Sequence, residues 1–465
     1  MNSPVLFLCA LMAAPALAAD AAAASAVQPQ IGKIVQEISA DRIHDTIARL
    51  VSFGTRNTMS SQDDPEHGIG AARKWIFAEF QSYSPRLQVR YDHWRVKKTG
   101  RIFKDADLYN VIAVLPGKTM PEVEVVVSAH YDSLNLGQMG RPLPGTGANA
   151  AGGQPLRIDW EKSAELPAPG ACDDGSGTAA VMELARVMSR YEFAKTLVFI
   201  AFAGEEQGLV GGTLEAAKAK AEKTPIEAVL NNDIIGTDVR GDGRTGNSAV
   251  NVYSDDRLDS PAQLLARYVQ WAGALYLPAF SVNVQYAQDR LGRGGDQTPF
   301  QQEGFSAVRI STPNEILANQ HHAADTLENM SVPYTARVAR LNAAAAAALA
   351  MAPRTPDIWT TVETTSAGIL RLPMISRGKG YDAVLRWHAA APDPNLKGYA
   401  VVMKATASPV WEREIFVGNV TEFTLEGVSI DDTKFGVKAI GKDGTESLVA
   451  AYVYPQRPKA EYKTE

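Results

Sequence analysis

The chain has few cysteines: its 465 residues include only Cys9 and Cys172. Cys9 lies in an apolar N-terminal segment that we expect to be removed, which leaves Cys172 alone. An exported protein with one cysteine has no internal disulfide, so its hydrophobic core and bound metal must supply its stability. Hydrophobic residues make up 45% of the sequence, which is enough for a sizeable core. We expect a structural role for Cys172, because neighbouring carboxylates raise the pKa of a thiol.

The chain also lacks a long run of basic residues. It has 46 Lys and Arg against 52 Asp and Glu, which gives a formal net charge of −6. Domains that bind nucleic acid usually carry clustered positive charge. We therefore expect no nucleic-acid partner.

Long apolar runs are confined to the N-terminus. Residues 4–19 are nearly all apolar or small, and Ala16-Leu17-Ala18 resembles a signal-peptidase site. We expect residues 1–19 to be a signal peptide, with an uncleaved N-terminal anchor as the alternative. The run is short for a membrane span, and no second run of spanning length follows it. We expect a soluble protein exported to the periplasm or the extracellular space; the sequence leaves its oligomeric state open.

The middle of the chain alternates between helical and strand patterns. Apolar residues recur at helical spacing from Ile31 to Val51. The same reasoning predicts further helices at 70–83, 179–191, 213–223 and 332–351, and strands at 87–96, 110–115, 123–128, 196–203 and 228–232. Such alternation predicts an α/β domain over residues 31–352, with a mostly parallel central sheet flanked by helices on both faces.

The pattern changes after the Pro353–Pro356 break. Seven short strands with turn residues between them are expected at 369–372, 383–388, 398–405, 412–417, 422–425, 434–440 and 448–454. This spacing predicts a second, all-β domain over residues 357–455, an immunoglobulin-like sandwich similar to a fibronectin type III module.

Acidic residues and histidines occur singly at the ends of the apolar runs. His130 follows the strand at 123–128, Glu205 and Glu206 follow 196–203, and Asp233 follows 228–232. Ligands of parallel sheets bind outside the carboxyl ends of the strands, so these side chains are expected at one edge. Carboxylate oxygen and imidazole nitrogen are typical zinc donors. With Asp173 and His321, the set is large enough for two metal ions and indicates a metal-dependent hydrolase.

Five motifs occur in a fixed order along the chain. They are His130-Tyr-Asp132, Gly170-Ala-Cys-Asp-Asp-Gly-Ser-Gly177, Gly204-Glu-Glu206, Asn232-Asp233 and the late His321-His322-Ala-Ala-Asp325. Together they resemble the M28 family of zinc peptidases, which includes secreted bacterial aminopeptidases. The resemblance covers about residues 31–351, so the last hundred residues lie outside it.

The resemblance implies a role for each motif residue. His130, Asp173 and Asp233 would hold one zinc ion, and Asp173, Glu206 and His321 the second, with Co²⁺ or Mn²⁺ as possible replacements. Spacing to the Asp325 of the Asp-Thr pair selects His321 over His322. In the family, the peptide bond between the residues that match Asp173 and Asp174 is cis.

Two further residues complete the implied catalytic set. Asp132 would orient the His130 imidazole. Glu205 would be the general base that takes a proton from the attacking water and returns it to the leaving amine.

The resemblance implies a secreted di-zinc aminopeptidase that removes N-terminal residues from peptides. Several alternatives stay open at this point. A carboxypeptidase or dipeptidase would need an Arg or Lys clamp for the substrate carboxylate, for which Arg290 and Arg293 are candidates. A glutaminyl-cyclase-like acyltransferase with one zinc is weakened by the complete two-metal set, and the last alternative is a non-catalytic binding protein.

Two loops are expected to shape the substrate pocket. The stretch from Leu134 to Pro169 is rich in Gly, Pro and Ala, and its length favours a lid or pocket wall, with plain disorder as the alternative. Gly292–Phe300 is expected to form another wall, and we assign no chemistry to its Asp296.

Overall fold

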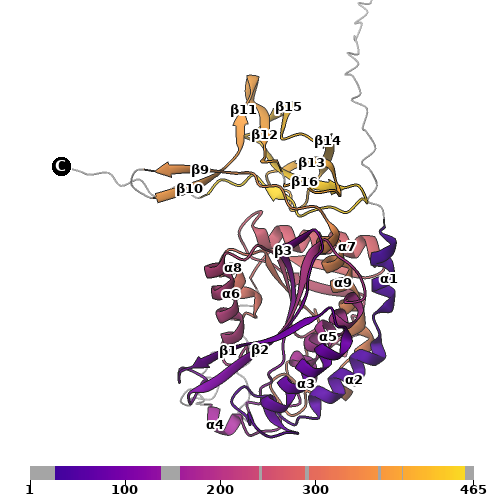
Figure 1. Cartoon of the computed structure of the whole chain (residues 1–465), viewed down its shortest axis with the longest axis vertical. Coiled ribbons are helices and arrows are strands. Elements are labelled where there is room, and N and C mark those ends of the chain that lie inside the picture. The colour runs from indigo at the N-terminus through magenta and orange to yellow at the C-terminus, as the bar shows by residue number, and fades with distance from the viewer. Residues whose placement is uncertain are drawn as a thin grey trace, which may run out of the picture.

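The computed structural model describes residues 27–137, 158–239, 243–288, 293–364, 368–389 and 391–455. The predicted signal peptide and the central part of the predicted lid lie outside these residues. Figure 1 shows two units: helices and a large sheet up to α9, and a smaller all-β unit placed beside α7 and α9. We call them the N-terminal and the C-terminal unit. None of the described helices is both long enough and apolar enough to cross a bilayer.

The central sheet of the N-terminal unit has eight strands within the described residues, in the order β1-β2-β4-β3-β5-β8-β6-β7. The strands are β1 (Gln88–Val96), β2 (Ala106–Leu115), β3 (Met120–His130), β4 (Lys195–Phe202), β5 (Ile226–Asn232), β6 (Ala249–Tyr253), β7 (Ser281–Gln285) and β8 (Ala307–Ser311). The four central strands β4, β3, β5 and β8 are parallel, and so is the pair of β6 and β7. Antiparallel pairing at β1–β2, β2–β4 and β6–β8 makes the sheet mixed, with the predicted parallel arrangement at its centre.

Helices cover both faces of this sheet, as predicted. One face carries α1 (Pro29–Glu37), α2 (Ala40–Val51), α3 (Gly68–Tyr83), α5 (Ser176–Met188), α7 (Pro261–Tyr276) and α9 (Val332–Met351). The other carries α6 (Val210–Glu222) and α8 (Gln297–Gln302). Alternate residues of one strand serve the two layers, since Val125 and Val127 pack in the first core while Val126 packs in the second. This double burial explains why the central strands are nearly continuous apolar runs.

The two ends of the central strands form opposite edges of the sheet, and different residues lie at each edge. At the N-terminal ends of β4 and β5, Lys195 and Glu227 form a buried ion pair, and Lys195 also donates to the carbonyl of Pro353. The chain therefore leaves the N-terminal unit at this edge. His130, the last residue of β3, lies at the opposite edge.

The C-terminal unit contains two antiparallel sheets, consistent with the predicted sandwich. One has the order β11-β12-β15 and the other β14-β13-β16-β17, and β9 and β10 form a separate hairpin. Their bounds are β9 (Trp359–Thr364), β10 (Gly368–Pro373), β11 (Ile375–Arg377), β12 (Asp382–Arg386), β13 (Leu396–Ala405), β14 (Arg413–Gly418), β15 (Glu422–Ser429), β16 (Thr433–Gly441) and β17 (Ala450–Ala451). Alternate residues such as Leu385, Val401 and Val437 form its core. The predicted strand at 448–454 is shorter in the structure, and β9 and β11 were not predicted.

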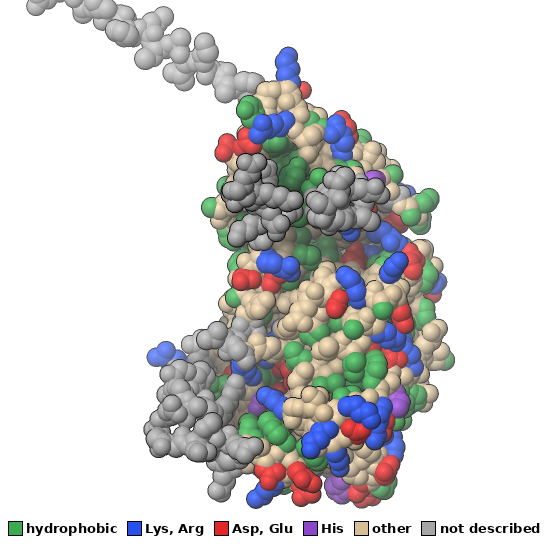
Figure 2. All heavy atoms as spheres, turned by 90° about the vertical axis from the view of Figure 1, so that its left-hand side faces the viewer, with side chains coloured by type: hydrophobic (Ala, Val, Ile, Leu, Met, Phe, Trp, Pro, Cys, Tyr) green, Lys and Arg blue, Asp and Glu red, His purple; other side chains and the backbone are tan. Residues whose placement is uncertain are grey.

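Figure 2 shows one face of both units. Lys and Arg side chains are interspersed with Asp and Glu on this face. Mixed charge of this kind is the usual surface of a folded domain in water.

Candidate metal centre

Three neighbouring strands deliver the candidate side chains to one edge of the sheet. His130 ends β3, Asp233 follows β5, and Glu205 and Glu206 follow β4. Asp173 lies in the turn Ala171–Gly175 immediately before α5. Because β3 lies between β4 and β5, the strand order brings these residues together, as predicted from the carboxyl ends of parallel strands.

The predicted ligands form two groups that share Asp173. In the first, His130 Nε2 lies 3.3 Å from Asp173 Oδ1 and 3.8 Å from Asp233 Oδ1. In the second, His321 Nε2 lies 3.1 Å from Asp173 Oδ2 and 3.1 Å from Glu206 Oε1. The potential ligand atoms of each group all lie within 4.8 Å of one another. Asp173 thus offers one carboxylate oxygen to each group.

The donor set fits a pair of metal ions. Asp173, Asp233 and Glu206 are all at least 94% buried, and buried carboxylates need cations or donors around them. Each group combines carboxylate oxygen with one imidazole nitrogen, the donors that zinc takes in proteins. Either group could hold one ion. His322 belongs to neither group among the described residues, so the geometry favours His321.

Asp132 acts mainly on the neighbouring turn. Its carboxylate accepts hydrogen bonds from the backbone N–H of Glu205 (3.3 Å) and of Glu206 (3.2 Å), and from Thr58 Oγ1 (3.1 Å). The expected contact with the His130 imidazole is looser. Nδ1 lies 3.2 Å from the Asp132 main-chain oxygen and 3.6 Å from its carboxylate. Asp132 therefore places the Glu205–Glu206 turn as well as the imidazole.

Two further carboxylates hold the turn that carries Asp173. Asp325 accepts hydrogen bonds from the backbone N–H of Cys172 and of Asp173, both at 2.9 Å. Asp174 accepts from the N–H of Gly177 (2.9 Å) and of Ile234 (3.2 Å). The peptide bond between Asp173 and Asp174 is cis, as the resemblance implied.

Burial dominates the electrostatics around the centre. It raises the pKa of the Glu205 carboxyl well above its usual range; the charge of His130 opposes this shift, and the nearby Glu206 and Asp233 carboxylates add to it. Burial also raises the pKa of the Cys172 thiol, which lies in the core with 7% exposure. This agrees with a structural role for Cys172.

Several supporting residues were missed by the sequence reasoning. Arg56 is fully buried and donates to the carbonyls of Tyr131 (2.7 Å) and Gly170 (2.8 Å), so it ties the His130 and Asp173 segments together. Arg309 Nε lies 3.0 Å from Asp233 Oδ2, and Gln320 Nε2 donates to Asp173 Oδ2 at 3.0 Å. For Arg309, its position inside the apolar strand Ala307–Ser311 was the one feature of the sequence that could have indicated a buried, functional charge.

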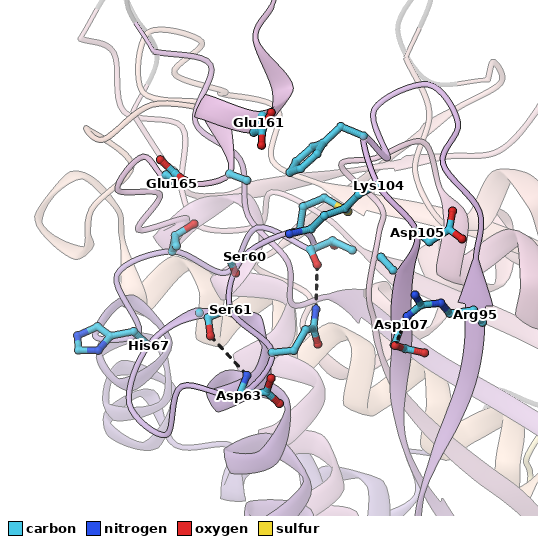
Figure 3. A pocket seen from close by; sticks show the side chains of 18 residues that line it. Ser60, Ser61, Asp63, His67, Arg95, Lys104, Asp105, Asp107, Glu161 and Glu165 are labelled. Atoms are coloured by element: carbon cyan, nitrogen blue, oxygen red, sulfur yellow. Dashed lines mark hydrogen bonds and ion pairs between the residues drawn. The ribbon is translucent and has the colours of Figure 1, made fainter.

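A groove of about 560 Å³ is lined by none of the residues of the two metal groups. Figure 3 shows its walls, with Ser60 and Ser61 on one side, Lys104 and Asp105 on another, and Glu161 and Glu165 above. Glu161 belongs to α4 (Trp160–Ser163), and Glu165 follows that helix. The lining residue Thr58 links the groove to the centre through its bond to Asp132.

The two expected pocket loops are described in part. Around the predicted lid, the N–H of Leu136 donates to the carbonyl of His321 (3.0 Å), and Ser163 Oγ donates to the carbonyl of Asn135. The first flank of the loop therefore contacts a candidate ligand residue, and the second flank is bound to the first. Of the two clamp candidates, Arg290 lies outside the described residues.

The other clamp candidate and residues 293–300 of the second loop lie within the described residues. Arg293 is paired with Glu315 at 3.4 Å. Asp296 is fully buried, and burial raises its pKa to about 8.

Comparisons with known proteins identify the family of this chain. The sequence profile described as peptidase family M28 matches residues 110–346, a span that holds every residue of the two metal groups. The chain belongs to peptidase family M28. Among relatives of this M28 peptidase, a probable zinc metalloprotease of Pyricularia oryzae is 34% identical over 88% of the chain and 82% of its own length. A probable zinc metalloprotease of Leptosphaeria maculans is 32% identical over 92% and 98%.

A solved structure has the same fold. The LapA aminopeptidase of Legionella pneumophila superposes with a TM-score of 0.51 and 20% identity, over 70% of this chain and 74% of that one. The family makes this chain a peptidase that acts on peptides, and the relatives' descriptions name zinc as their metal.

Proposed function

We propose that this M28 peptidase is an exported aminopeptidase that uses two zinc ions to remove N-terminal residues from peptides. The observation that carries the proposal is the pair of ligand groups sharing Asp173, with Glu205 directly before the ligand Glu206. Zinc is supported by the donor set and by the zinc metalloproteases among the relatives. Aminopeptidase activity is supported by the motif resemblance and by the LapA fold.

His130, Asp173 and Asp233 would hold one ion, and Asp173, Glu206 and His321 the other. When bound, zinc supplies Lewis acidity that polarises a carbonyl and makes water a better nucleophile. A fixed ligand frame is required for this chemistry, and Asp132 and Asp325 supply it by holding the two turns that carry the ligands.

Glu205 is the proposed general base. It is partly exposed, whereas Glu206 is buried, so the pair divides into one group that can face substrate and one that can face metal. A Glu205 carboxylate oxygen would take the proton from the attacking water as the carbon–oxygen bond forms. The same group would then pass that proton to the leaving nitrogen as the peptide bond breaks.

The test compares wild type with Glu205→Gln on aminoacyl anilides and short peptides, with zinc content measured on the same samples. Glu222→Gln, at the exposed end of α6, is the matched control. We expect the control to match wild type, and Glu205→Gln to keep its zinc while kcat falls by about 10²- to 10⁴-fold. Loss of zinc in Glu205→Gln would contradict the assigned role. A zinc-loaded wild type that is inert on every free-amine substrate would refute the aminopeptidase proposal.

A further inference from the structure

An arginine of the β1–β2 hairpin reaches the candidate metal centre. Arg101 lies in the connection between β1 and β2, and its Nη1 donates to the main-chain carbonyl of Glu206 at 2.6 Å. Its guanidinium carbon lies 5.1 Å from the ring centroid of Trp160, the first residue of α4. One N–H and one face of the guanidinium are thus fixed next to a proposed metal ligand.

Arg101 lies on the same side of the centre as His321. The helix that carries Trp160 is bound to the loop after Asp132, because Ser163 Oγ donates to the carbonyl of Asn135 at 2.6 Å. The next residue of that loop, Leu136, donates its N–H to the carbonyl of His321. Arg101 therefore connects the Glu206 turn to α4, the helix whose neighbouring loop contacts His321. Glu206 and His321 both belong to the second metal group.

The charge of Arg101 has no counter-ion among the described residues. Three other arginines near the centre or the groove do have one: Arg309 is paired with Asp233, Arg293 with Glu315 and Arg95 with Asp107. The buried Arg56 instead donates to main-chain carbonyls. The Arg101 side chain is exposed even though Nη1 is bound. A guanidinium carries five N–H donors, so donors remain for a planar anion.

We propose that Arg101 is a substrate-binding residue that takes a carboxylate on the leaving-group side of the scissile bond. The proposal rests on the peptidase function proposed above. A peptide extends about 3.5 Å per residue, so a carboxylate one or two residues beyond the scissile bond lies roughly 3.5–7 Å from it. Arg101 is bound to the main-chain carbonyl of Glu206, one side-chain length from the carboxylate of that proposed ligand. Planar Arg–carboxylate pairing is specific in geometry, which makes Arg101 a determinant of substrate choice.

Two substrate groups carry this chemistry. One is the free α-carboxylate of a dipeptide or tripeptide, and the other is the side chain of Asp or Glu after the cleaved residue. The substrates are therefore two matched pairs: leucyl-leucine with leucyl-leucinamide, and leucyl-aspartate amide with leucyl-asparagine amide. The first pair tests the α-carboxylate and the second tests the side chain.

The experiment measures kcat and KM on all four substrates for wild type, Arg101→Gln, Arg101→Lys and the control Lys104→Gln. Lys104 is an exposed cation of the same hairpin and lines the groove, without a bond to Glu206. We expect Arg101→Gln to lose about 10- to 100-fold in kcat/KM, mainly through KM, on the acidic member of one pair. Its neutral partner should stay within about twofold of wild type, and Arg101→Lys should recover part of the loss.

A structural role gives a different pattern. If Arg101 only anchors the Glu206 turn, Arg101→Gln lowers kcat on neutral and acidic substrates alike and lowers zinc content, and the proposal is overturned. Equal effects of Lys104→Gln and Arg101→Gln would overturn it too, because general surface charge would explain them. A wild type that cleaves none of the four substrates would overturn the aminopeptidase function itself, which is a separate and visible result.

Discussion

Asp259 is a buried acidic residue at the junction of the two units, and its replacement tests how they are joined. It lies just before α7, and its Oδ1 is 2.7 Å from Lys404 Nζ on β13 and 2.7 Å from Arg267 Nη1 on α7. The side chains are 2%, 0% and 8% exposed, respectively. One buried carboxylate therefore compensates two cations, one from each unit.

Asp259→Asn removes the only negative charge of this cluster while preserving its shape. Breaking a buried pair by removing one partner costs about 3–5 kcal/mol, because the remaining charge is left uncompensated. Lys404→Met should cost less, since Asp259 keeps Arg267. The double variant should be less destabilised than the sum of the two single variants, because it leaves one unpaired cation rather than two.

Urea unfolding followed by circular dichroism measures these differences. The exposed pair of Arg377 and Asp431 offers the control Arg377→Gln, whose expected cost is below about 1 kcal/mol. If Asp259→Asn costs no more than this control, the cluster is not a buried ionic contact between the units. If the double variant costs the full sum, the two charges do not interact.

Three further predictions follow from other contacts. Burial and the neighbouring Asp92 raise the pKa of Glu215 to about 7, from a usual 4.5. The folded state therefore holds this proton more tightly, and stability falls as pH rises from about 4.5 to about 7, by at most about 3 kcal/mol. Glu215→Gln should stabilise the chain at pH 8 but not at pH 4, and equal effects at both pH values would refute this. Zinc at about 1,000 times its Kd should stabilise the metal-free chain by about 4 kcal/mol per ion, seen as a rise in Tm. In His321→Ala, the zinc-induced rise in Tm should be smaller by the contribution of one ion, whereas in His322→Ala it should be unchanged. The reverse result would make His322 the ligand instead of His321. Gly212→Ala should destabilise the fold and lower Tm, because its Cβ would lie 2.5 Å from Asp296 Oδ1, and an unchanged Tm would contradict this contact.

Three of the four parallel central strands were predictable because their burial is nearly complete; the fourth, β8, was not predicted, since it is short and contains the charged Arg309. β3, β4 and β5 are apolar on both faces, β3 and β5 end in a polar residue, and Glu205 follows β4 after a short turn, so these strands and their ends are visible in the sequence. The strands β6 and β7 were missed because they are short and half-buried, with Asn251 and Asn283 between their apolar residues. The helix α7 was also missed, although Ser260 caps it and Pro261 opens it, a recognisable start.

The candidate ligands were predictable for a related reason, while their supports were not. Strand ends gather ligands at one edge, and the motif order supplied the rest. Thr58 and Arg56 belong to a polar loop more than 70 residues before their partners, Asp132 and Tyr131. Such contacts depend on how the loop folds over the sheet, and no local pattern indicates this.

The C-terminal unit contacts the edge of the sheet opposite the metal centre, so we expect it to affect stability but not catalysis. Lys195 and Pro353 place the link between the units at the N-terminal ends of the central strands, whereas His130 ends β3 at the other edge. β3 has 11 residues, and at about 3.3 Å per residue the two edges lie roughly 35 Å apart. Asp259→Asn should therefore lower the free energy of unfolding without changing kcat/KM of the folded enzyme at 25 °C. A parallel loss of activity at temperatures where the variant is fully folded would show that the two edges are coupled, and that the C-terminal unit acts on the site from a distance.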